Sequence, residues 1–123
     1  MPEYADKDGH PLTREQWMRL SADERYARVA ATCLTSASTT DAYEVSTLWF
    51  GINYGALGET LMYETIVFAP DGDILALHRY STEPAARAGH DRAVADTAAL
   101  LTDPVALALA WNDAVRVWTP VTL

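Results

Sequence analysis

The hydrophobic and polar positions in the middle of the chain follow the spacing of β-strands. Four runs rich in β-branched and aromatic residues succeed one another, and short polar segments separate them. SASTTD lies between the first two runs, and Pro70-Asp71-Gly72, a typical hairpin turn, lies between the last two. Strands with such short links pair with their neighbours in sequence, so we expect an antiparallel meander. The runs are ARVAATCLTS (27–36), AYEVSTLWFGIN (42–53), LMYETIVFA (61–69) and DILALHRYS (73–81).

The spacing becomes helical after the fourth run. Small and apolar residues recur on one side from Ala86 to Leu101, Ser81 or Thr82 can cap the start, and Pro84 suits a first helical turn. This pattern predicts a helix over about 83–101 whose apolar side lies on the sheet. The predicted fold class is therefore α+β, with one long helix packed on a four-stranded antiparallel meander sheet.

Two shorter helices are predicted near the N-terminus. Thr13 is followed by Gln16 three residues later, and Ser21 is followed by Glu24 in the same way. Both pairs have the form of a capping box, in which two side chains satisfy the first free N–H groups of a helix. The expected helices cover residues 13–20 and 22–26.

The C-terminal segment allows two interpretations. Asp103 followed by Pro104 is a good cap and first-turn pair, which favours a second helix. The apolar residues that follow, however, alternate as they would in a strand. We predict a helix to about Val115 and an extended end, which together form a hydrophobic C-terminal extension. The alternating residues are Val105, Leu107, Leu109 and Trp111.

Size and charge limit the kinds of partner. The 123 residues suit one domain, 1–123, and the net charge of -8 argues against sequence-independent binding of nucleic acid or of anionic membranes. No run approaches membrane-spanning length and no signal peptide is recognised, so a cytoplasmic location is expected. Trp111 and Trp118 need cover, either from the domain itself or from a second copy, and a homodimer is predicted.

The second strand run carries large groups on both of its sides. Trp49 and Asn53 would lie on one face, while Leu48 and Phe50 would lie on the other. Two explanations remain open. Either the N-terminal helices or the C-terminal segment cover the second face, which is the more common arrangement, or the face is an aromatic recognition surface.

Two ionisable residues attract interest among these elements. Glu64 lies in an apolar strand, where a carboxylate is either paired, for example with Arg79, or has a raised pKa. His90 lies on the apolar side of the long helix, where a hydrogen-bonded core histidine is more common than a base or a ligand. Both could converge with Tyr80. The candidate binding residues are Trp49, Asn53, Tyr63, Glu64, Tyr80 and His90.

Motifs for metal, phosphate and covalent chemistry are not recognised. The three histidines show no metal-ligand spacing, and the single Cys33 has no histidine or arginine beside it. GALGET lacks the lysine and the following helix of a phosphate loop. No cofactor, metal or catalytic residue is therefore predicted.

Four blocks of the chain resemble a widespread family of small, mostly uncharacterised bacteriophage and prophage proteins. These blocks are YADKDGHPL, VSTLWFGIN, MYETIVF and RYSTEPAARAGHDRAV, and Trp17 matches as well. The resemblance implies a cytoplasmic protein of phage or prophage origin. An Asp-His pair of the family falls on Asn53 and Tyr54 here, so an activity that depends on that pair would be lost.

Three functions are consistent with these patterns. The first is a phage-type accessory protein that binds a host protein and so modulates host defence, without being an enzyme. The second is an oligomer that binds or sequesters a small molecule or nucleotide. The third is a hydrolase that uses Glu64 and His90, which requires the two side chains within hydrogen-bond reach of each other.

Overall fold

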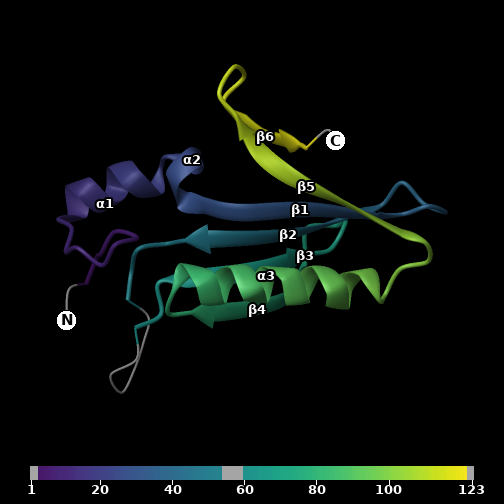
Figure 1. Cartoon of the computed structure of the whole chain (residues 1–123), viewed down its shortest axis with the longest axis horizontal. Coiled ribbons are helices and arrows are strands. Elements are labelled where there is room, and N and C mark those ends of the chain that lie inside the picture. Colours follow the sequence, from purple (N-terminus) through teal and green to yellow (C-terminus); the bar gives the residue numbers. More distant parts are fainter. Residues whose placement is uncertain (1–2, 54–59, 122–123) are drawn as a thin grey trace.

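A computed structural model of the chain describes residues 3–53 and 60–121 as one α+β unit (Figure 1). The sheet of the described residues has six strands, in the order β4-β3-β2-β1-β5-β6, and every neighbouring pair is antiparallel. The elements are α1 (Arg14–Ser21), α2 (Glu24–Ala27), β1 (Arg28–Ser36), β2 (Ala42–Trp49), β3 (Tyr63–Phe68), β4 (Ile74–Tyr80), α3 (Glu83–Ala98), β5 (Pro104–Asn112) and β6 (Val117–Pro120).

The predicted meander is confirmed for β1 to β4. The turn between β3 and β4 closes as its sequence requires, because Gly72 adopts a φ of 91° and its N–H donates to the carbonyl of Ala69 at 2.9 Å. The predicted number of four strands is wrong, however, because β5 and β6 extend the sheet on the far side of β1.

The predicted helix over 103–115 is also wrong. Asp103 takes a left-handed φ of 47° instead of capping a helix, and the chain enters β5 at Pro104. β5 then pairs with β1 from Ala31↔Leu109 to Ser36↔Pro104. The alternating pattern decides the outcome because the free edge of β1 supplies a hydrogen-bonding partner, and tertiary pairing outweighs a local capping signal.

The helices agree more closely with the sequence. Thr13 and Gln16 form the predicted capping box, with Gln16 N–H donating to Thr13 Oγ1 at 3.2 Å. The second box is wrong, since Asp23 and not Ser21 caps α2. Thr82 caps α3, which ends at Ala98, three residues before the expected end.

The helices cover one face of the sheet. α3 lies across it (Figure 1). Ala93 of α3 packs with Leu34, Val45 and Val67. A second cluster, at the end of the strands near α1 and α2, encloses Trp49. The C-terminal segment extends the sheet as β5 and β6, which excludes it as the cover of the other face, one of the alternatives that the sequence left open. No helix in the described residues is long and apolar enough to span a bilayer.

Candidate functional site

A groove runs between the edge strand β4 and helix α3. Its volume is 520 Å³, and it lies at the edge of the sheet that β4 forms. α3 packs mainly over β1, β2 and β3, and its small residues Gly89 and Ala93 form part of the groove wall opposite β4. Its lining comprises Val67, Leu75, Ala76, His78, Arg79, Tyr80, Gly89, Arg92, Ala93, Asp96, Thr97 and Leu100.

Tyr80 closes one end of this groove. A Cβ atom at Gly89 would overlap the Tyr80 hydroxyl, so the glycine allows the phenol ring to lie directly on the helix. Leu75 and Leu100 lie toward the other end, and both are exposed. Arg92 and Asp96 are exposed on α3, and neither has an ion-pair partner within the described residues. The groove therefore has apolar walls and free charges on the helix side.

His90 lies beneath the helix, away from the groove. Its Nε2 is 2.8 Å from Thr32 Oγ1, and its Nδ1 is 2.8 Å from Thr47 Oγ1. Thr47 in turn lies 2.7 Å from the hydroxyl of Thr65. Burial lowers the pKa of His90, which keeps the ring neutral. His90 is thus the hydrogen-bonded core histidine that the sequence favoured.

Glu64 lies on the opposite face of the sheet. Its neighbour Thr65 faces α3, so alternation along β3 directs Glu64 away from the helix. Its carboxylate accepts from Arg79 Nε at 3.4 Å, as the simpler interpretation predicted. The expected convergence of Glu64 with His90 is wrong, because the sheet separates them. The pair that the hydrolase hypothesis requires is not formed.

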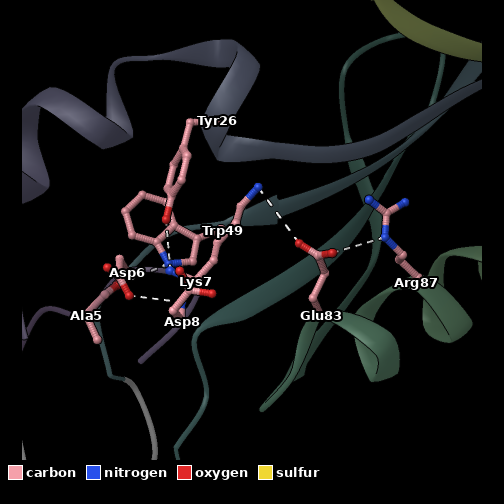
Figure 2. A network of polar contacts seen from close by, with 8 residues as sticks. All are labelled: Ala5, Asp6, Lys7, Asp8, Tyr26, Trp49, Glu83 and Arg87. Atoms are coloured by element: carbon pink, nitrogen blue, oxygen red, sulfur yellow. Dashed lines mark hydrogen bonds and ion pairs between the residues drawn. The ribbon is translucent and has the colours of Figure 1, made fainter. Parts of the chain in front are cut away.

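Trp49 is buried beneath the N-terminal segment. Its Nε1 donates to the carbonyl of Ala5 at 3.2 Å, and the ring packs edge to face with Tyr26. Figure 2 shows the Trp49 and Tyr26 rings beside the polar contacts of Lys7. The backbone N–H of Lys7 donates to the Tyr26 hydroxyl at 2.9 Å, and its ammonium lies 3.9 Å from Glu83 (Figure 2). Trp49 therefore anchors the N-terminal segment and forms no exposed recognition surface.

Asn53 and Tyr63 do share a small pocket of 290 Å³ at the end of the strands. Lys7 and Ser81 also line it. Burial raises the pKa of Tyr63 to about 12, with a smaller contribution from Glu83. Burial also lowers the pKa of the Lys7 ammonium, although Glu83 opposes that shift. This pocket combines only two of the six candidate residues.

Tyr54 and most of GALGET, residues 54–59, lie outside the described residues.

Asp6, Asp8 and His10 form a group that the sequence reading missed. Their potential ligand atoms lie within 4.8 Å of one another, and the D-x-D-x-H spacing was the available signal. Asp6 Oδ1 nevertheless accepts hydrogen bonds from the backbone N–H groups of Asp8 and His10, both at 2.9 Å. Those bonds hold a tight turn and account for the cluster without a metal.

Comparison with protein-family models, with curated proteins and with solved structures finds no match for this chain.

Proposed function

We propose that the protein acts by binding, and that its partner is an extended segment of another protein. The segment adds as a further strand to the outer edge of β4 and places alternate side chains in the groove beside α3. The observation that carries this proposal is an edge strand of seven residues next to an open groove. Strand addition between an edge strand and a helix is a recurrent mode of peptide recognition.

The two edges of the sheet support the choice of β4. Proteins protect edge strands by making them short, by placing proline or charged residues such as lysine in them, or by a β-bulge. β6 is such an edge, with four residues that end at Pro120. β4 is longer and contains neither proline nor lysine, and its one irregularity lies near its start, between the pairs Val67↔Ala76 and Phe68↔Ile74. The described residues pair with β4 on one side only. Its outer backbone groups are therefore able to form hydrogen bonds with a partner.

The groove limits the chemistry of that segment. A register shift between Val67 and Phe68 leaves Leu75 as a bulge, so regular pairing is confined to Ala76–Tyr80. A segment of about five residues fits this length. Apolar side chains suit the wall near Leu100. An acidic side chain suits the free guanidinium of Arg92, provided that it lies away from the carboxylate of Asp96.

The resemblance to phage and prophage proteins supports a protein of the bacterial host as the partner. Binding of one host protein by a small accessory protein is consistent with modulation of host defence. The absence of a Glu64–His90 pair supports a function in binding over a hydrolase, because the expected acid and base do not meet.

Selection from a random peptide library against the full chain tests the proposal. We expect enriched peptides to share an alternating apolar pattern with one acidic residue. Arg92→Glu should weaken their binding at least about tenfold, because it removes a charge-assisted contact. Arg14→Glu is the matched control, since Arg14 is also exposed but lies on α1. Peptides that bind both variants equally would place the site elsewhere.

The small pocket supports a second candidate, the binding of a small polar molecule. Lys7, Asn53 and Ser81 supply polar groups in a partly open pocket that Ala5 and Met62 also line, and such a mixture of polar and apolar groups is usual in ligand sites. A ligand that binds only the folded chain raises the melting temperature. A thermal-shift screen of metabolites and nucleotides measures this effect, and a response abolished by Asn53→Leu would favour this candidate over the first.

A further inference from the structure

The face of the sheet opposite α3, which we call the uncovered face, is hollowed. The hollow has a volume of 940 Å³, and the described residues that line it come from strands and turns only. α1 and α2 lie beyond the ends of the strands, and α3 lies on the other side (Figure 1). The lining comprises Arg28, Cys33, Ala42, Tyr43, Glu44, Phe68, Ala69, Pro70, Gly72, Leu107, Leu109, Trp118 and Pro120.

The apolar residues of this face are arranged in two margins. At the centre, the paired small residues Ala31 and Ser46 are only 2% exposed. Large apolar side chains remain exposed on either side of this centre. They are Ile74 and Leu77 on β4, and Val105 and Leu107 on β5.

The charges of the uncovered face cancel each other. All four Asp, Glu, Lys and Arg residues of the six strands lie on this face, and they form two ion pairs. Arg28 lies 3.5 Å from Glu44, and Arg79 lies 3.4 Å from Glu64. The strands therefore contribute no net charge here, and the surplus that gives the chain its charge of -8 lies on helices and loops.

We infer that the uncovered face is occupied by a second copy of this chain. Two acidic copies repel each other at most surfaces, but they can approach at a face whose charges are already paired. With the two-fold axis parallel to the strands, the β4 margin of each copy lies against the partner's β5 margin. The two hollows then face each other and enclose a shared interior.

The size of the face suits a stable dimer. Six strands spaced about 4.8 Å apart and about 20 Å long present roughly 500 Å² in projection. Protruding side chains raise the accessible area above that projection, toward the roughly 800 Å² per partner of standard interfaces. The outer edge of β4 stays open in this arrangement, so dimerisation is independent of the segment binding proposed above.

Light scattering of the full chain at about 100 µM tests the inference. We expect twice the chain mass of 13.5 kDa. Leu107→Lys should raise the dissociation constant at least about 100-fold, because two buried lysines would face an apolar margin. Leu107 is 42% exposed in one copy, so the single chain should still fold. Met18→Lys is the matched control, since Met18 is 53% exposed but lies on α1.

The single Cys33 provides a second readout, because it lies on the uncovered face directly across from Leu107. Thiol labelling should be slow in the wild type and in Met18→Lys, and it should be fast in Leu107→Lys. A monomeric wild type, or a dimer that persists unchanged in Leu107→Lys, would overturn the inference. Circular dichroism of each variant distinguishes loss of the dimer from loss of the fold.

Discussion

Replacement of His90 by alanine should destabilise the protein strongly. The imidazole connects α3 to β1 and β2 through two hydrogen bonds of 2.8 Å, to Thr32 and Thr47. It is 5% exposed, so water does not replace those bonds in the intact fold. The substitution removes both bonds and leaves a cavity under the helix.

The expected magnitude follows from these contacts. Each hydrogen bond contributes about 1 kcal/mol net, and each buried hydroxyl left unpaired costs about 1–3 kcal/mol. Thr47 keeps its contact with Thr65, so the full penalty applies mainly to Thr32. Together with the cavity, His90→Ala should lower the free energy of unfolding by about 3–5 kcal/mol. Urea denaturation followed by circular dichroism measures this difference.

The stability should also depend on pH through His90. Burial holds its folded-state pKa below the usual 6.5, so the unfolded chain takes up the proton first as the pH falls. Stability contributed by the neutral ring is present above about pH 6.5 and is lost as the pH falls toward the folded pKa, by up to about 1.4 kcal/mol per pH unit. His90→Ala should remove this slope, whereas His78→Ala, at an exposed position, should retain it.

Two results would refute this reasoning. The first is a loss below about 1 kcal/mol in His90→Ala at pH 7, which is the range of most surface substitutions. The second is an unchanged slope in His90→Ala between about pH 5 and 7, which would assign the pH dependence to other groups.

Three further substitutions test the packing at other positions. Gly89→Val should lower the free energy of unfolding by about 1–3 kcal/mol, because the valine side chain would overlap the Tyr80 ring. A variant as stable as the wild type in urea denaturation would contradict that contact. Trp49→Phe should lower the free energy of unfolding by about 1–3 kcal/mol and loosen the N-terminal segment, because the carbonyl of Ala5 loses its hydrogen-bond donor. Limited proteolysis should then cleave that segment faster than in the wild type. Glu64→Gln should change stability by less than about 1 kcal/mol, because its ion pair is partly exposed; a larger loss in calorimetry would indicate a buried role.

The sequence predicted the parts of the fold that depend on local signals. The alternation of β1 to β4, the turn at Gly72 and the cap at Thr82 each arise from neighbouring residues, and each is found. β5 was mistaken for a helix because Asp103 and Pro104 give a local capping signal, while the hydrogen-bonding partner that decides the structure is β1, about 70 residues away in the chain.

The candidate site was harder to predict, because it depends on which face each side chain takes. His90 and Glu64 both stood on elements that pack together, but the alternation of β3 places the sheet between them. The groove beside β4 has no sequence motif, since it arises from small residues on α3 and from the position of β4 at the edge.

Amide hydrogen exchange of β4, with and without a selected peptide, tests the central claim most directly. A strand added to the outer edge forms hydrogen bonds with alternate backbone groups of Ala76–Tyr80. We predict that the peptide slows exchange of alternate amides in this stretch and leaves α1 unchanged. Peptide binding that leaves all β4 amides at their free rates, with protection confined to other elements, would contradict strand addition at this edge.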